Sequence, residues 1–463
     1  MMARMSIAAF PLMPTLMHAR EAPPAGGPPR PFTVPAKERF SLPNGMQATL
    51  VPFGQLPKVT VCVLVRTGNL DEREQTWLAD ITGELMREGT ASLDGSELAR
   101  KTASMGGALG VAVGADQTTV TADVLSEFGP ELVQLLADVT IAPRLPEAEL
   151  ARIKADFQRN LAIARTQPQA LAGEAFAAAM YGDHPYGRTY PTGEQLAGYG
   201  IEDVRRYHAA NFGAARTEVL VAGKFDATAM RAAIESAFGA WAHGPEPLVD
   251  IPKRSEQPQI RLIERPDAPQ TTLYLGLPVI DPTQPDYTKL AVANMVLGGF
   301  FSSRVTLNLR EEKGYTYSPA SGISSHYRTA TWVQTADVTT QYSGPAVAEI
   351  FKEIDRLRNE PPGAEELERV KSYMTGTFVL GNASRGGLIG QLAFLDLHGL
   401  PDSYLSDYVS RVQAVTPEQV RDAAKAFLDP SKMSLVAVGD LDVVKQQLEA
   451  VPPIATLLKN QTK

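Results

Sequence analysis

Two halves of this chain repeat one sequence pattern, at an offset of 216 or 217 residues. The stretch 201–226, IEDVRRYHAANFGAARTEVLVAGKFD, returns at 416–442 as TPEQVRDAAKAFLDPSKMSLVAVGDLD. Likewise Glu149, which follows a proline turn, is matched by Glu366. Such self-similarity indicates that one supersecondary unit occurs twice, and any fold of the chain must accommodate both copies.

The repeat sets the expected domains. The first copy occupies 38–243 and the second 259–450, joined by residues 244–258, whose prolines and mixed charges indicate an exposed linker. Residues 1–37 are interpreted as a leader followed by a tether rich in proline, and residues 451–463 as a tail.

Hydrophobic periodicity predicts the fold class. Strand-like alternation appears at 46–52, 58–66 and 117–125, whereas 74–88 and much of 126–180 have the spacing of amphipathic helices. This grouping predicts an α+β fold with two homologous domains, each a sheet packed with long helices on one face.

Composition excludes several classes of protein. The chain has 463 residues with 44% hydrophobic and 21% charged, which is typical of a globular protein rather than a disordered or coiled-coil one. Asp and Glu number 52 against 44 Lys and Arg, for a net charge of -8. Nucleic-acid binding needs clustered basic residues, so no nucleic-acid partner is expected. The single cysteine, Cys62, excludes an internal disulfide.

The first residues resemble a short secretory signal. Arg4 precedes an apolar run from Met5 to Met17, which favours a periplasmic or exported protein over a cytoplasmic one. Whether the leader is cleaved is left open. The run is too short for a bilayer, which takes about 20 apolar residues, and no later stretch is expected to supply a membrane span.

Four motifs give the chain a family resemblance. They are the Arg66–Gly68 turn, the helix-like WLADITGELMREGT from Trp77 to Thr90, the HPYG turn from His184 to Gly187, and LGGFFSSRVTLNLREEKGYTYS at 297–318. On these the chain resembles the pitrilysin-type (inverzincin) zinc peptidases, which include mitochondrial processing peptidase and its bacterial relatives. The resemblance covers nearly everything after residue 38. It implies antiparallel-rich sheets and two domains that form one half of a clam shell.

The zinc motif of that family is missing. Active members carry H-x-x-E-H on this helix, where two histidines one turn apart hold the metal and the glutamate activates a water. The corresponding positions here are Asp80, Gly83 and Glu84, and the family's third ligand, a glutamate, falls on Asn160. The resemblance therefore implies no metal in this chain. Asp80 and Glu84 share a helix face, so they are either a hard-cation site or a solvated acidic face.

The histidines do not replace this motif. None of the six forms a pair at metal-binding spacing. His184 in the HPYG turn is expected to be structural, and His326 either lines a substrate chamber or lies on a surface strand.

The second half keeps another part of the family's site. In active relatives an Arg and a Tyr seven residues apart contact the substrate, and Arg310 and Tyr317 have that spacing. Such donors can stabilise the oxyanion of a tetrahedral intermediate. The alternative is that Arg310 is a surface residue paired with Glu311 and Glu312, and that Tyr317 is half buried.

The resemblance thus implies a subunit that is inactive alone. A homologous partner with an intact H-x-x-E-H motif would hold the zinc, and this chain would bind unfolded or short peptides and add Arg310 and Tyr317 to the partner's site. Strand addition along 108–114 is a possible mode of peptide binding. One alternative is a structural scaffold, as in the core subunits of respiratory complexes that resemble these peptidases; another is an enzyme with a divergent site at Asp80 and Glu84. Peptide preference and self-pairing stay open.

Overall fold

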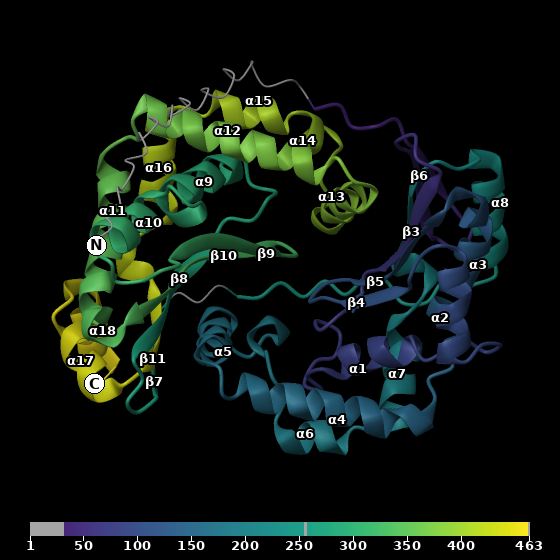
Figure 1. Ribbon diagram of the computed structural model, residues 1–463, viewed down its shortest axis with the longest axis horizontal. Helices are drawn as coiled ribbons and strands as arrows, with labels where there is room; N and C mark the ends of the chain where they lie inside the picture. Colours follow the sequence, from purple (N-terminus) through teal and green to yellow (C-terminus); the bar gives the residue numbers. More distant parts are fainter. Residues whose placement is uncertain (1–31, 254–256, 462–463) are drawn as a thin grey trace, which may run out of the picture.

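The computed structural model describes residues 32–253 and 257–461, and Figure 1 shows two domains at opposite ends of the molecule. The expected leader, most of the tether and part of the linker lie outside the described residues.

The first sheet is built from six described strands. Its order is β1 (Glu38–Ser41), β2 (Gln47–Pro52), β6 (Thr217–Gly223), β3 (Lys58–Val65), β5 (Thr118–Leu125) and β4 (Gly110–Val113). Only β2 and β6 pair in parallel within it. All but the first residue of β3 are buried, as its run VTVCVLV requires of a central strand covered on both faces.

The second sheet repeats the first. Its order is β7 (Ile260–Glu264), β11 (Ser434–Gly439), β8 (Gln270–Val279), β10 (Thr329–Thr339) and β9 (Ala320–His326). Again one pair, β7 with β11, is parallel and the others are antiparallel. Each strand corresponds to one of the first sheet from β2 onward. The structure therefore confirms two homologous α+β domains with antiparallel-rich sheets.

Each domain buries an apolar core between its sheet and its own helices. In the first domain α3 (Gly129–Ile141) packs on β3 and β5, and α8 (Ala227–Phe238) packs on α3. In the second, α11 (Ser343–Asn359) packs with α16 (Pro417–Phe427), and α9 (Tyr287–Asn294) packs on α16.

The other face of each sheet is covered by a helix of the opposite half. Helix α5 (Pro168–Tyr181) packs on β8 and β11, and α13 (Arg385–His398), its counterpart in the repeat, packs on β3 and β6. The prediction of helices on one face was therefore wrong. The two halves exchange a helix, because each sheet leaves an apolar face that its own helices do not cover.

Both exchanged helices are fixed by close contacts. A Cβ atom on Gly276 of β8 would lie 2.8 Å from Phe176 Cζ of α5, so the glycine lets the helix approach the sheet. On the first sheet, Arg385 of α13 donates to Asp123 at 2.9 Å, and Lys58 reaches the same carboxylate at 2.8 Å.

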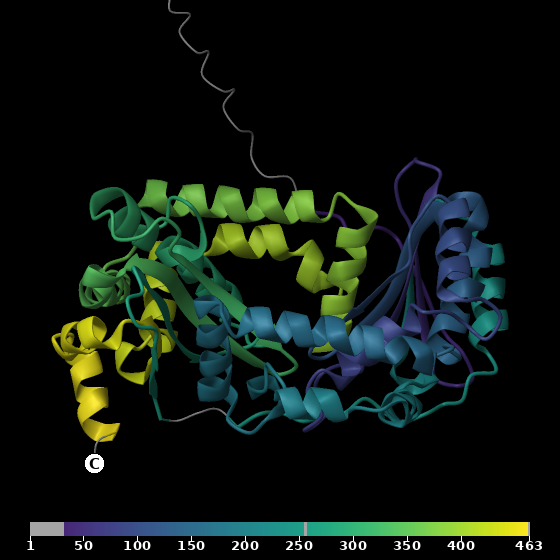
Figure 2. The same ribbon diagram turned by 60° about the horizontal axis from the view of Figure 1, so that its bottom comes forward.

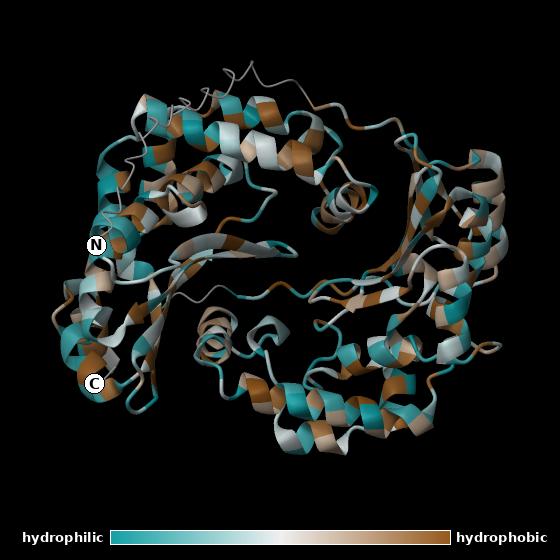
Figure 3. Ribbon diagram, viewed as in Figure 1, coloured by the Kyte–Doolittle hydropathy of each residue, from teal (hydrophilic) through white to brown (hydrophobic). Residues whose placement is uncertain are grey.

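Long helices connect the domains. Helix α4 (Glu147–Ala164) leads to α5, and α12 (Ala364–Gly381) leads to α13. The two run on opposite sides of the molecule in Figure 1, and both lie along its long axis in Figure 2. Hydrophobic and hydrophilic residues alternate along them (Figure 3), as expected of helices with one solvated face. The other helices of eight or more residues are α1 (Leu78–Met86), α2 (Gly95–Ser104), α7 (Ile201–Asn211), α17 (Leu441–Glu449) and α18 (Pro452–Gln461).

One helical segment, Tyr287–Glu312, is long and apolar enough to cross a membrane by length and hydropathy alone, whereas no such stretch was expected after the leader. Most of this segment is buried, and it contributes Leu290, Val296 and Leu309 to the core of the second domain.

Candidate functional site

Helix α1 carries the positions of the zinc motif, and a carboxylate caps its first turn. Trp77, which precedes the helix, has a left-handed backbone with φ of 70°. The Glu72 carboxylate accepts hydrogen bonds from the backbone N–H of Trp77 at 2.9 Å and of Ala79 at 3.0 Å. Glu72 thus satisfies amide groups that would otherwise be unpaired at the start of the helix.

The carboxyl of Asp80 is linked to that of Glu72 through a shared hydrogen-bond donor, Asn69. Asn69 Nδ2 donates to Asp80 Oδ2 at 2.7 Å and to Glu72 Oε2 at 3.3 Å. Burial raises the pKa of Glu72 to about 8, and the nearby Asp80 adds to this, against the backbone hydrogen bonds. Burial also raises the pKa of Asp80, against the hydrogen bond from Asn69. The first ligand position, Asp80, therefore holds a partly buried carboxyl engaged by an amide.

The position of the catalytic base is closed. Gly83 is buried where α1 lies against β4, and a Cβ atom there would lie 2.7 Å from Val113 Cγ2 and 3.5 Å from Val111 Cγ1. A carbon at the first of these distances is well inside van der Waals contact. Glycine at this position lets the edge strand lie directly on the helix.

The remaining two positions point elsewhere. Glu84 is half exposed, forms an ion pair with Arg87 at 3.2 Å and lines a different pocket from Asp80. Asn160 lies exposed on α4 and is not among the described residues that line either pocket. Across 32–253 and 257–461, no group of three or more His, Cys, Asp or Glu side chains could hold a metal ion. These donors do not fit the zinc of the related peptidases.

Asp80 opens into a small pocket between the domains. The pocket, of about 210 Å³, is lined on one side by Asn69, Glu72 and Asp80 and on the other by His326 of β9. His326 Nδ1 lies 3.3 Å from Asp116 Oδ2, and its ring stacks on Tyr186 at 4.3 Å between centroids.

The histidines of this region have different roles. His326 ends the edge strand β9, is partly exposed and lines this small pocket, so both of its expected roles stay open. His184 Nδ1 accepts from the Tyr186 N–H at 3.2 Å, which caps the short helix of the HPYG turn. This contact gives His184 the structural role that the turn suggested.

Arg310 and Tyr317 are brought together by the fold. Arg310 lies on the π-helical turn Leu307–Glu312, and its guanidinium carbon is 4.6 Å from the centre of the Tyr317 ring. The centre of the Phe301 ring lies 4.5 Å from the same carbon. Arg310 Nε pairs with Glu311 at 3.1 Å. Tyr317 is 76% exposed, so the alternative of a half-buried tyrosine was wrong.

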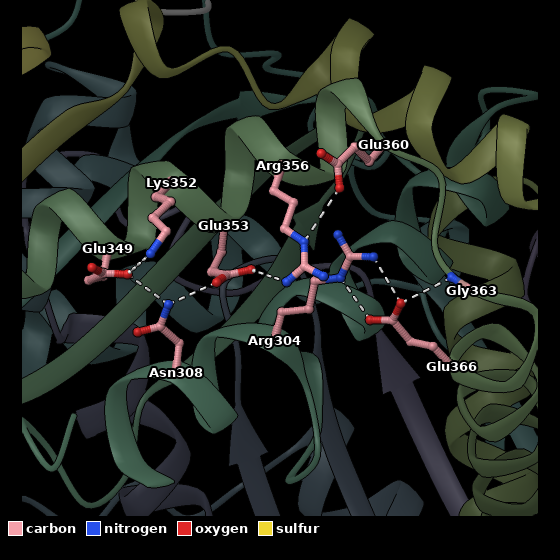
Figure 4. Close-up of polar contacts among 9 residues, drawn as sticks. All are labelled: Arg304, Asn308, Glu349, Lys352, Glu353, Arg356, Glu360, Gly363 and Glu366. Carbon is pink, nitrogen blue, oxygen red and sulfur yellow. Dashed lines mark hydrogen bonds and ion pairs between the residues drawn. The ribbon is translucent and has the colours of Figure 1, made fainter. Parts of the chain in front are cut away.

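A buried polar network fixes the segment that carries Arg310 (Figure 4). Arg304 donates to both carboxylate oxygens of Glu366 on α12, at 2.7 and 2.8 Å. Asn308 donates to Glu349 and Glu353 on α11, each at 2.8 Å. Arg304, Asn308 and Glu353 are buried, so these charge-assisted bonds hold the segment against two helices.

Sequence reasoning missed several residues around these positions. Glu72 and Asn69 lie in the loop before α1, and Asp116 comes from the turn between β4 and β5. No local pattern marks them, because the fold alone brings them together. Phe301 had a signal, since it stands within the same second-half motif as Arg310.

The fold and the altered helix define a duplicated protein of the zinc-peptidase type, and comparison with known proteins identifies the family. The sequence profile described as "Insulinase (Peptidase family M16)" matches residues 54–191, and "Peptidase M16 inactive domain" matches residues 200–374. The chain belongs to the M16 family of insulinase- and pitrilysin-type proteins.

Relatives match over most of their length. The uncharacterized zinc protease YmxG of Bacillus subtilis is 24% identical over 413 residues, which cover 86% of this chain and 98% of that protein. The non-peptidase homolog YmxG of Helicobacter pylori is 23% identical over 386 residues, or 81% and 87%. A crystal structure of a peptidase M16 inactive domain from Pseudomonas fluorescens has the same clam-shell fold, with a TM-score of 0.81 and 24% identity over 87% of this chain and 98% of that one.

Proposed function

We propose that this chain is the zinc-free subunit of a heterodimeric M16-type metallopeptidase. In this role it binds peptide and contributes Arg310 and Tyr317 to the zinc site of a homologous partner with an intact H-x-x-E-H motif. The observation that carries the proposal is a contrast within one chain. The zinc positions hold a carboxyl engaged by Asn69, a glycine packed against β4 and a glutamate that lines another pocket, whereas the Arg310–Tyr317 pair is assembled and its tyrosine is exposed.

The pair can supply one part of the chemistry of peptide hydrolysis, the stabilisation of the oxyanion. Attack of water on a peptide carbonyl places negative charge on its oxygen, and a guanidinium and a phenol can both donate hydrogen bonds to it. A pair whose tyrosine is exposed and whose arginine is partly exposed can reach a reaction centre that lies on another molecule. In the partner, the zinc polarises the carbonyl and lowers the pKa of the attacking water.

The names of related proteins support a non-catalytic role. The matching profile of the second half is described as an inactive domain, and the Helicobacter pylori relative as a non-peptidase homolog. The Bacillus subtilis relative is instead described as a zinc protease. The residues at Asp80, Gly83 and Glu84 support a likeness of this chain to the former group.

Peptide binding by strand addition has a suitable edge. The segment predicted for it, 108–114, contains β4, which pairs with β5 on one side and ends the sheet on the other. Successive residues of a strand direct their N–H groups to opposite edges. Of the two substitutions Val111→Pro and Ala112→Pro, one therefore removes an N–H donor from the free edge and the other removes one that faces β5. One of these two variants should lose peptide binding; equal binding by both variants and the native chain would remove strand addition from the proposal.

The sequence also supports a proposal for the kind of partner and the location of the complex. The acidic balance supports a peptide rather than a nucleic-acid partner, and the leader supports a periplasmic or exported complex. We propose no cofactor in this chain itself.

The decisive experiment measures casein hydrolysis by the complex purified with its partner. Arg310→Gln and Tyr317→Phe should each lower kcat on the order of a hundredfold. Matched controls are Arg369→Gln and Tyr373→Phe on α12, both exposed, which should leave it unchanged. A scaffold predicts full activity for both site variants. Metal-dependent hydrolysis by this chain alone would instead favour a divergent enzyme at Asp80 and Glu84.

A further inference from the structure

Phe301 stands out among the exposed apolar side chains. It is 66% exposed, although its neighbour Phe300 packs against the core of the second domain. Single exposed apolar side chains are common on protein surfaces, so the exposure of Phe301 gains meaning only from what its ring contacts. The contact that Phe301 makes with its ring is with the guanidinium of Arg310.

We propose that Phe301 is a positioning residue of the peptide site: together with Tyr317 it packs against the Arg310 guanidinium and fixes its orientation, so that the terminal nitrogens of the group face the peptide. The inference rests on the proposed function, because it concerns how Arg310 is presented. It adds a third residue to a pair that sequence spacing had suggested.

The geometry restricts Arg310 in the required way. The Phe301 and Tyr317 rings, centred 4.5 and 4.6 Å from the guanidinium carbon, restrict the orientations that the group can adopt. Cation–π stacking uses the faces of a guanidinium, whereas its hydrogen bonds lie in its plane. Among the described contacts, Nε is the nitrogen engaged, by Glu311 at 3.1 Å. The two terminal nitrogens are therefore left to donate together to an acceptor in the plane.

The base of this arrangement is rigid. Arg304 is bound to Glu366 and Asn308 to Glu349 and Glu353, so the backbone on which Arg310 stands is tied to α12 and α11 (Figure 4). The remaining freedom of Arg310 is in its long side chain. The two rings limit that freedom before any peptide arrives, which lowers the entropy lost on binding.

The first test observes the stacking without peptide. In the full chain labelled with ¹⁵N-arginine, the Hε resonance of Arg310 should lie upfield because of ring currents, and Arg310→Gln assigns it. Phe301→Leu should move the signal toward the position of a free arginine, whereas Phe301→Tyr should retain the upfield shift. An unchanged signal in Phe301→Leu would overturn the proposal. Leu380→Ala, at a 75% exposed site on α12, is the control for folding and for exposed apolar area.

The second test asks whether Phe301 acts through Arg310. Binding of fluorescein-labelled β-casein to the full chain should weaken about two- to tenfold in Phe301→Leu, from the loss of one ordered side chain. In the Arg310→Gln background the same change should have no effect. An equal loss in both backgrounds would show direct contact with the peptide and would overturn the positioning role. If Arg310→Gln alone leaves casein binding unchanged, Arg310 does not contact the bound peptide and that part of the proposed function fails, even where the ring-current shift is present; the oxyanion role is tested separately by kcat.

Discussion

Replacing Gly83 by alanine tests the packing that closes the former catalytic position. A Cβ at 2.7 Å from Val113 Cγ2 forces β4 or α1 to shift, and overpacking of this kind costs roughly 1–3 kcal/mol. Alanine is the better helix former by about 1 kcal/mol. We therefore expect a net loss of about 1 kcal/mol in the free energy of unfolding.

The assay is urea unfolding followed by circular dichroism, in two backgrounds. In Val113→Ala the obstructing methyl group is gone, so Gly83→Ala should now stabilise the protein by about 1 kcal/mol through helix propensity. This reversal of sign identifies the contact between the two residues. Stabilisation by Gly83→Ala in the native background, or equal changes in both backgrounds, would refute the reasoning. A glutamate at 83 begins with the same Cβ, so restoring the zinc motif also requires β4 to move.

Two further predictions concern buried groups. Because the pKa of Glu72 rises from 4.5 to about 8 on folding, the folded state binds an extra proton between these pH values, and stability should fall as the pH rises through that window. Glu72→Gln should flatten this slope and raise the urea midpoint at pH 8, while the exposed Glu74→Gln leaves both unchanged; an unaltered slope in Glu72→Gln would contradict the assignment. Gly276→Ala should cost about 3 kcal/mol or more, because its Cβ would lie 2.2 Å from the Trp332 carbonyl oxygen, and Phe176→Leu should not rescue it. Gly322→Ala on β9, with nothing within 4 Å of the new Cβ, is the control; equal melting temperatures for the two glycine variants would show that the close approach of the backbone is unimportant.

The duplicated fold could be predicted because its signals are local. The run VTVCVLV indicates β3. The repeat matches Gly223 to Gly439, and these glycines end two corresponding strands, β6 beside β3 and β11 beside β8. The exchange of α5 and α13 could not be predicted in the same way. Periodicity shows that a helix has an apolar face, but it does not say which sheet that face covers.

The candidate site also has features that the sequence predicts and features that depend on tertiary structure. The loss of the zinc ligands at Asp80, Gly83 and Glu84 follows from the sequence, since all three stand on one helix. The pocket that Asp80 shares with Glu72 and His326 depends on how two domains meet, and burial then sets the pKa of its carboxyls. The exposure of Tyr317 also depends on tertiary structure, because its neighbours in sequence do not determine what covers it.

The central claim is that this chain completes a zinc site on a partner, and native mass spectrometry of the chain purified from its own cells tests it most directly. This measurement weighs the intact complex and its bound metal together. The account predicts a one-to-one complex with a second chain of similar size and a single zinc ion, which stays with the partner when the subunits dissociate. A monomer or homodimer of this chain that holds its own zinc would contradict the account.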